Sequence, residues 1–310
     1  MLIGIDGYEA NVSQKVGIGQ YAFETIRHLL DQDKKNKYRI YIPEKPIDSL
    51  REISDNSEIR IVGPAKAWTQ WRLPIDLYAH YPRPNVFFTP THYAPRFSPI
   101  PQVISIMDLS YLFFPEMFRK SDLWQLKLWT DYSIKKAKAV LTISESTKND
   151  IVKLYRIPAE KITVTYPGYN ADKFKIQNSK FKIKEIKDKY KINGEYLLYV
   201  GTLQPRKNLI RLIDAFILSM QELNDETTIL VLAGKKGWLY KEIFEKVIQT
   251  GMEKRIVFTD FVCDEDLPWI ISGAKCLTLV SLYEGFGIPV VEAMACGVPV
   301  VVSSVSSLPE

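Results

Sequence analysis

Short apolar runs rich in β-branched residues alternate along the chain with longer amphipathic segments. The short runs are typical of buried strands, and the longer segments, whose apolar residues fall on one helical face, are typical of helices. The first half is predicted to hold strands at Leu2–Ile5, Tyr38–Ile42, Ile59–Val62, Val86–Phe88, Val103–Ile106, Val140–Ile143 and Ile162–Val164, and helices at Ile18–Leu30, Trp68–His80, Arg119–Lys136 and Glu145–Tyr155. This alternation predicts a parallel sheet covered by helices.

The alternation is interrupted at Ala171–Gly194, where lysines are frequent and large apolar runs are few. We interpret this stretch as a connection between two domains, in which the lysine-rich segment could form one helix. The alternation resumes with strands at Tyr196–Val200, Thr228–Leu232, Ile256–Phe258, Cys276–Val280 and Val298–Val302, and with helices at Leu209–Leu223, Leu239–Thr250, Glu265–Ser272 and Val290–Ala295. We therefore expect an α/β fold with two Rossmann-like, doubly wound parallel-sheet domains that face a cleft at the carboxyl ends of their strands.

The composition is that of an ordinary globular protein, with 46% hydrophobic and 25% charged residues over 310 positions. The formal net charge of +5 is small for this length. Proteins dedicated to nucleic acids concentrate more positive charge on one face, so we expect no nucleic acid as a partner. A modest positive excess suits a diphosphate ligand or an anionic membrane surface, and it equally serves solubility alone.

The cysteines and the N-terminal residues indicate the cellular compartment of the protein. Cys263, Cys276 and Cys296 form no C-x-x-C pair and are odd in number, so a disulfide framework or a zinc site is not expected. The first ten residues lack the basic start and long apolar stretch of a signal peptide. No apolar run approaches the length that spans a bilayer. We therefore expect a cytoplasmic protein.

Two glutamates with seven residues between them, Glu284 and Glu292, follow a predicted strand near the end of the chain. Gly285 and Gly287 allow a tight turn and close approach of a ligand to the backbone, and Pro289 suits the start of a helix. Glu292 is then expected on the first helical turn, whose free N–H groups bind phosphate. Carboxylates beside such a site would accept hydrogen bonds from sugar hydroxyls. A helix-start glutamate and a solvated loop glutamate would show the same spacing without any ligand.

The stretch 281–301, which contains this motif, resembles the signature of retaining glycosyltransferase family 4, whose members have the GT-B fold. The resemblance extends to Ser144–Asp150, Tyr166–Asn170 and Gly201–Asn208, which occur in the order of the family. It covers nearly the whole chain, weakly between residues 35 and 100 and strongly from residue 140 onward.

The resemblance implies a hexosyltransferase that needs neither metal nor cofactor and uses a nucleotide-sugar donor of the GDP-mannose or UDP-glucose type. Glu284 would contact the transferred sugar, and Glu292 would bind the ribose diol. Arg206 and Lys207 would clamp the donor diphosphate, which agrees with the ability of two cations to offset charge on a leaving group. Glu284, Arg206 and Lys207 are the catalytic candidates. The other donor-binding candidates are Gly285, Phe286, Gly287, Gly17, Gly19 and Gly201.

The same resemblance assigns a different role to each domain. Residues 1–170 would form the acceptor side, 171–194 the connection, and 195–310 the nucleotide-sugar domain. The acceptor is expected to be a glycan or a lipid-linked sugar. The loop Val16–Tyr21, which contains Gly17 and Gly19, would close over the donor from the N-terminal domain, although a plain tight turn explains these glycines equally well.

Two features depart from the family pattern. The family usually carries a histidine, thought to contact the transferred sugar, where this chain has Met107, and methionine donates no comparable hydrogen bond. Asp108 remains a candidate sugar or acceptor residue together with Met107, although a strand-end aspartate also bonds local backbone. The chain stops at Glu310, whereas the family continues through further helices. We therefore expect an incomplete second domain with exposed apolar surface.

Three further patterns favour other chemistry less strongly. Asp264 and Asp266 form a D-x-D pair, which binds metal in another transferase fold but here is typical of an acidic helix start. The three histidines lack metal-ligand spacing, and His92 is a candidate for lining the cleft. The segment Trp124–Trp129, with basic residues on both sides, is either a buried helix face or a peripheral membrane contact.

We interpret the chain as a retaining glycosyltransferase of glycan or polysaccharide biosynthesis. The diphosphate would leave from the face that the acceptor hydroxyl attacks, and the leaving phosphate would take the acceptor's proton, since no carboxylate pair at glycosidase spacing is recognisable. Two alternatives remain open: a nucleotide-sugar epimerase of the same architecture, and a non-catalytic protein that binds nucleotide sugars or regulates a partner. A dehydrogenase is disfavoured because no G-x-G-x-x-G motif follows a predicted strand.

Overall fold

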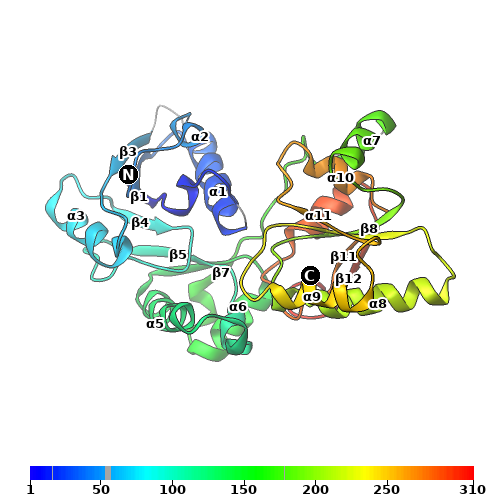
Figure 1. Cartoon of the computed structure of the whole chain (residues 1–310). Helices are drawn as coiled ribbons and strands as arrows, with labels where there is room; N and C mark the ends of the chain where they lie inside the picture. The colour runs from blue at the N-terminus through cyan, green and yellow to red at the C-terminus, as the bar shows by residue number, and fades with distance from the viewer. Residues whose placement is uncertain (16, 53–56, 178) are drawn as a thin grey trace. The chain divides into compact units, whose positions relative to one another are not determined.

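The computed structural model describes residues 1–15, 17–52, 57–177 and 179–310. The chain divides into two compact units (Figure 1). Unit 1 consists of Met1–Leu112 and Lys120–Tyr166, and unit 2 consists of Phe113–Arg119 and Pro167–Glu310. Each unit contains its own parallel sheet, and the two are described separately.

In unit 1 the described residues form a seven-stranded, all-parallel sheet in the order β3-β2-β1-β4-β5-β6-β7. The strands are β1 (Leu2–Asp6), β2 (Lys37–Ile42), β3 (Ser57–Ile61), β4 (Val86–Thr89), β5 (Gln102–Ile106), β6 (Ala139–Thr142) and β7 (Ile162–Val164). The helices that start in it are α1 (Ile18–Gln32), α2 (Asp48–Arg51), α3 (Leu73–Ala79), α4 (Ser110–Phe113), α5 (Lys120–Lys136) and α6 (Glu145–Tyr155).

Both faces of this sheet are buried. Ile40 and Ile42 of β2 pack with α1 on one face, where Ile26 of α1 is fully enclosed. Tyr41, which lies between them and therefore points to the other face, packs in a second cluster with Trp68. A strand that is buried on both faces has a nearly continuous apolar sequence, which explains why the sequence pattern locates these strands well.

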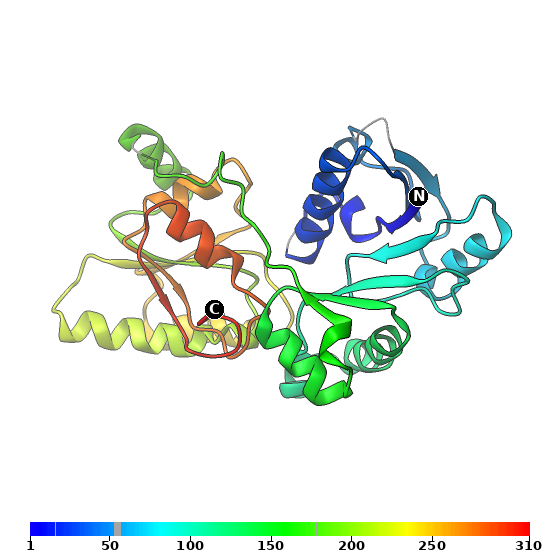
Figure 2. The ribbon, with the colours of Figure 1, turned by 180° about the vertical axis from the view of Figure 1, so that it is seen from behind.

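In unit 2 the described residues form a five-stranded, all-parallel sheet in the order β10-β9-β8-β11-β12. The strands are β8 (Tyr196–Val200), β9 (Ile229–Ala233), β10 (Ile256–Asp260), β11 (Cys276–Leu279) and β12 (Val300–Val302). The helices are α7 (Lys180–Lys189), α8 (Leu209–Glu222), α9 (Lys241–Thr250), α10 (Leu267–Ser272) and α11 (Ile288–Ala295). Figures 1 and 2 show α8 and α9 on one face of this sheet and α10 and α11 on the other.

The strand order reverses direction at one place in each sheet. In unit 1 this switch lies between β1 and β4, and in unit 2 it lies between β8 and β11. Adjacent strands whose connections run to opposite sides leave a crevice outside their carboxyl ends, where open α/β sheets bind ligands. The predicted fold class, two Rossmann-like parallel-sheet domains, is therefore confirmed, and the topology identifies one candidate crevice in each unit.

The unit boundaries differ from the expected domain limits. The stretch 171–194, expected as a connection, lies in unit 2, because Ile186 of α7 is buried in the core of that unit. The segment Phe113–Arg119 also belongs to unit 2. There the ring of Phe113 stacks on Tyr283 at 5.3 Å between centroids, and Phe118 lies 5.5 Å from the ring of Trp238. These aromatic contacts join positions more than a hundred residues apart, which local patterning does not reveal.

Two smaller differences have local causes. The helix expected at Trp68–His80 is a π-helical turn, Trp68–Arg72, followed by α3. Pro74 lacks the N–H that would bond the carbonyl one turn earlier, which accounts for the widened turn before it. The short helices α2 and α4 hold only four residues each, too few for an amphipathic period to show in the sequence.

None of the helices among the described residues is both long and apolar enough to cross a bilayer. The segment Trp124–Trp129 lies in α5, where Trp124 is 62% exposed and Trp129 packs edge-on against Tyr93 with ring centroids 5.3 Å apart. One end of the segment therefore serves packing within unit 1. A membrane contact through the other end stays a prediction.

The close approach of β8 and β9 at their carboxyl ends predicts the effect of one substitution. A Cβ on Gly234, whose φ is +152°, would lie 1.9 Å from the carbonyl oxygen of Gly201. Gly234→Ala should therefore destabilise unit 2 by more than the roughly 1 kcal/mol expected for a left-handed alanine in open space. The matched control is Gly251→Ala, whose φ is +65° and whose Cβ would meet nothing within 4 Å. Thermal unfolding of the two variants tests this, and equal melting temperatures would contradict it.

Candidate active site

The sequence-predicted catalytic residues lie at the two strand ends that flank the switch point of unit 2. After β8 the chain forms a short 3-10 turn, Pro205–Lys207, which carries Arg206 and Lys207. After β11 it reaches Glu284. The two segments are tied together directly, since the side-chain amide of Asn208 donates to the carbonyl of Val280 at 3.1 Å. The N–H of Leu282 also donates to the carbonyl of Arg206 at 2.9 Å.

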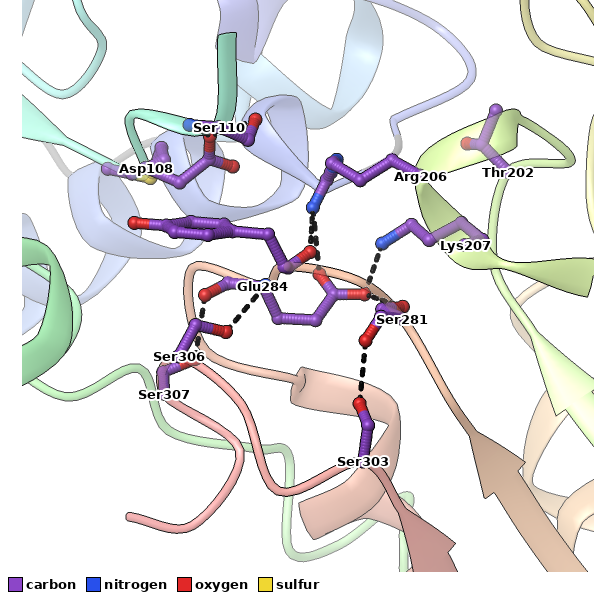
Figure 3. Close-up of polar contacts among 12 residues, drawn as sticks. Asp108, Ser110, Thr202, Arg206, Lys207, Ser281, Glu284, Ser303, Ser306 and Ser307 are labelled. Carbon is purple, nitrogen blue, oxygen red and sulfur yellow. Dashed lines mark hydrogen bonds and ion pairs between the residues drawn. The ribbon is translucent and has the colours of Figure 1, made fainter. Parts of the chain in front are cut away.

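The carboxylate of Glu284 lies between the two predicted cations (Figure 3). Lys207 Nζ is 2.5 Å from Oε1, and Arg206 Nη1 is 3.4 Å from Oε2. Ser281 donates its hydroxyl to Oε1 at 2.6 Å, and Arg206 also donates to the carbonyl of Tyr283. The three residues that the sequence singled out for catalysis are thus brought together in one ion-paired cluster.

This cluster keeps Glu284 charged although the side chain is only 7% exposed. Burial acts to raise the pKa of Glu284, but the charges of Lys207 and Arg206 and the hydrogen bonds outweigh it, so the pKa lies below its ordinary value. Two cations face one carboxylate, which leaves these three side chains with one net positive charge. A site of this kind suits a ligand that brings its own negative charge.

Serines that follow β12 hold the backbone around Glu284. The N–H of Glu284 donates to Ser306 Oγ at 2.8 Å, and Ser307 Oγ donates to the carbonyl of Glu284 at 2.9 Å. Ser303 Oγ donates to the carbonyl of Ser281 at 2.6 Å (Figure 3). The sequence analysis missed these residues. The serine-rich run directly after the last predicted strand was the available signal, because hydroxyls near strand ends often bond local backbone.

Two of the glycines predicted to bind the donor are required by the local structure. Gly287 has φ +105° at the start of α11, and a Cβ there would lie 2.7 Å from the side chain of Leu308. Gly201 has φ +153°, and a Cβ there would lie 2.7 Å from the hydroxyl of Tyr199. Gly285 is buried and Phe286 is half-buried beside Glu284. Contact of these four residues with a donor stays a prediction.

Glu292 is not on the first helical turn, as the motif predicted. Helix α11 begins at Ile288, so Glu292 is its fifth residue and lies one turn further along. Pro289 takes the second helical position rather than the first, which extends the helix start by one residue. The side chain is half-buried, and within the described residues its carboxyl group accepts no hydrogen bond. Burial raises its pKa to about 8, against the opposing charge of Lys173 and with a further contribution from Asp264.

Comparison with known proteins identifies the family. The model of glycosyltransferase family 4 matches residues 17–173, and the model of glycosyl transferases group 1 matches residues 182–310. The chain belongs to glycosyltransferase family 4. One relative is O-antigen chain mannosyltransferase B of Escherichia coli, which is 30% identical over 95% of this chain and 80% of its own length. O-antigen chain mannosyltransferase RfbU of Salmonella typhimurium is 30% identical over 66% of this chain and 52% of its own length.

Solved structures support the GT-B fold of this glycosyltransferase. The structure of Anabaena Alr3699/HepE in complex with UDP-glucose has a TM-score of 0.73 at 17% identity and covers 99% of this chain and 81% of that one. WaaG, a glycosyltransferase involved in lipopolysaccharide biosynthesis, has a TM-score of 0.74 at 17% identity and covers 98% and 82% of the two chains. At such identities the likeness concerns the fold alone.

The candidate residues of unit 1 lie at the start of α1 and after β5. Gly17, at φ +38°, directly precedes α1, while Gly19 packs α1 closely on the backbone, since a Cβ there would lie 3.0 Å from the carbonyl of Glu9. Val16, in the same motif, lies outside the described residues. Asp108 follows β5 and accepts the N–H and hydroxyl of Ser110 at 2.9 and 2.6 Å, the local bonding that the sequence left open. Met107 is buried.

The acidic pair of this glycosyltransferase that resembles a metal motif is engaged by cations. Asp266 Oδ2 lies 2.5 Å from Lys189 Nζ and accepts the hydroxyl of Tyr190 at 2.8 Å, and Asp264 lies 3.4 Å from Lys173. Within the part of the chain that the structure describes, no group of three or more His, Cys, Asp or Glu side chains is arranged to hold a metal ion. Metal-independent activity stays a prediction.

The raised pKa of Glu292 predicts how the stability of the glycosyltransferase depends on pH. Because the folded-state pKa, about 8, exceeds the ordinary value of 4.5, the neutral form is favoured by folding. This contribution to stability is complete below about pH 4.5 and is lost as the pH rises through 8. Glu292→Gln should therefore raise the melting temperature relative to wild type at pH 9. The increase in melting temperature should be smaller at pH 5. A constant difference at all pH values would contradict the assignment.

Proposed function

We propose that this chain transfers a mannosyl residue from a nucleotide sugar of the GDP-mannose type to a hydroxyl of a growing glycan, with retention of the anomeric configuration. The observation that carries the proposal is the Glu284 cluster at the switch point of unit 2, with its net positive charge. The choice of mannose draws on the names of the two mannosyltransferase relatives. GDP-mannose is thereby preferred to UDP-glucose as the first donor to be tried.

In the proposed mechanism the donor diphosphate lies against Arg206 and Lys207. The bond between the anomeric carbon and the diphosphate oxygen breaks while the acceptor oxygen bonds to the same face of that carbon. The acceptor's proton passes to the departing phosphate oxygen, and a nucleoside diphosphate leaves. The two cations offset the charge that develops on the phosphate, in a site where burial strengthens the interaction.

Glu284 and Glu292 take different parts in this mechanism. Glu284 has a lowered pKa and stays ionised, so it serves as a hydrogen-bond acceptor for a hydroxyl of the transferred sugar and not as a proton donor. It also holds Arg206 and Lys207 in position before the donor arrives. Glu292, with a pKa of about 8, is mainly protonated at neutral pH and can both donate to and accept from the ribose diol.

The remaining parts of the proposal concern metal, acceptor and location. Arg206 and Lys207 supply the positive charge that a divalent metal supplies in other transferases, which supports metal-independent transfer. The acceptor is a glycan or a lipid-linked sugar, in keeping with the O-antigen chain in the names of the relatives. A lipid-linked acceptor would bring the enzyme to the cytoplasmic face of a membrane, where Trp124 of α5 is a candidate contact.

The transfer assay uses GDP-mannose and a mannoside acceptor, with UDP-glucose as the alternative donor and a chelator in a parallel reaction. We expect a mannosylated product, unchanged yield with the chelator, and an α-linkage by NMR of the anomeric proton. A β-linked product would refute retention, and loss of yield with the chelator would refute metal independence. Binding of GDP without any transfer would favour a non-catalytic nucleotide-sugar protein, and a changed sugar without acceptor would favour an epimerase.

Replacement of Lys207 tests the role of the cations. Lys207→Ala removes the ammonium that lies 2.5 Å from Glu284 Oε1 and would meet the developing phosphate charge. We expect kcat to fall by more than about tenfold, in line with the loss of one transition-state contact. Lys254→Ala, which removes an exposed lysine of the same unit, is the matched control and should leave kcat unchanged. Equal kcat values for both variants would remove Lys207 from the mechanism.

A further inference from the structure

The switch point of unit 1 presents a buried histidine. Strands β1 and β4 flank this point, and the chain passes from Thr89, the last residue of β4, to His92 three residues later. Thr89 is paired in register with Ile104 of β5, and Met107 stands three residues beyond Ile104. His92 and Met107 therefore each stand three residues beyond the last paired residues of two neighbouring strands. The crevice at this switch point is where a doubly wound sheet binds its ligand.

The imidazole of His92 has an incomplete set of hydrogen bonds. The side chain is 7% exposed, and its Nδ1 is enclosed without a hydrogen-bond partner among the described residues. Burial lowers the pKa of His92, and the charge of Asp108 only opposes this, so the ring is neutral at pH 7. A neutral imidazole has one donor and one acceptor nitrogen. We place the proton on Nε2, because Nδ1 is the ring nitrogen that is enclosed and has no acceptor to donate to.

The carboxyl groups at the ends of the two strands that neighbour β4 favour a neutral polyol over an anion. Asp6, at the end of β1, is buried, and burial raises its pKa to about 7 with a contribution from Glu9, while the N–H of Tyr8 bonds to it at 2.9 Å. Asp108, after β5, adds a second carboxyl group. Carboxyl groups on both neighbouring strands disfavour a phosphate here, whereas hydroxyls can pair with carboxyl oxygens and with an imidazole N–H. Met107, at the level of His92, offers no comparable donor.

We propose that His92 is a substrate-contacting residue of unit 1, which donates a hydrogen bond from its imidazole to a sugar hydroxyl at the switch point between β1 and β4. The class of ligand, a neutral hexose, rests on the proposed function. A purely structural role is the competing explanation, since buried histidines also fill cores. The two differ in whether the imidazole responds to a sugar.

NMR of the 310-residue chain, labelled with nitrogen-15 in its histidines, tests this directly. The chain has three histidines, so the variants His28→Gln, His80→Gln and His92→Gln assign every imidazole signal. On addition of methyl α-mannoside we expect the signals of His92 to move and saturate while those of His28 and His80 stay in place. An unmoved His92 signal at the highest mannoside concentration overturns the proposal. This readout does not require transfer activity, so its failure can be distinguished from a failure of the proposed function.

Kinetics provide the second readout. His92→Gln should lower kcat/KM for the acceptor by about tenfold, the equivalent of one hydrogen bond. Its thermal shift with GDP, which reports the site of unit 2, should equal that of wild type. His28→Gln, which replaces an exposed histidine on α1, is the matched control. Unchanged kcat/KM in a folded His92→Gln variant overturns the proposal. Failure of the wild type to transfer sugar from any donor overturns the proposed function instead.

Discussion

The candidate site depends on the ion pairing of the buried Glu284 carboxylate with two cations. A charge enclosed to this degree is costly unless it is paired, and the pairing here requires that Arg206 and Lys207 come from the end of a different strand. The strand ends β8 and β11 must therefore stay in register with one another. The side-chain amide of Asn208 and the serines after β12 form hydrogen bonds with the backbone around Glu284. These bonds help to keep the two strand ends in register. Such a cluster contributes little net stability, and in the proposed function it holds two cations ready for a ligand.

The same topology produces two different chemical environments. Both sheets reverse their strand order once, and both present polar residues at the strand ends that flank the reversal. In unit 2 these residues are mainly cationic, which suits a diphosphate. In unit 1 they are a neutral imidazole and two carboxyl groups, which suit hydroxyls. Under the proposed function, each unit would supply the groups for one part of the reaction, although the two sheets share the same winding.

The sequence predicted the strands well because both faces of each sheet are covered. The predicted strands Tyr196–Val200 and Ile162–Val164, for example, are reproduced by the structure residue for residue. Glu284, Arg206 and Lys207 could be grouped because parallel strands end at one edge and because the family resemblance named them. The serines after β12 and the unpaired nitrogen of His92 could not be predicted in this way. Both depend on which side chains meet across the fold, and neither leaves a periodic pattern in the sequence.

The two glutamates of the motif acquire opposite properties from their surroundings. Glu284 is almost fully enclosed, yet its pKa falls because two cations lie against it. Glu292 is less enclosed, yet burial raises its pKa to about 8 because Lys173 compensates only in part and Asp264 adds repulsion. One carboxyl is therefore a fixed negative charge at neutral pH, while the other is mainly a neutral donor and acceptor. Paired carboxyl groups with separated pKa values are a recurring way to obtain two roles from one residue type. The seven residues between them, which carry the chain from a loop into the second turn of α11, create this difference in environment.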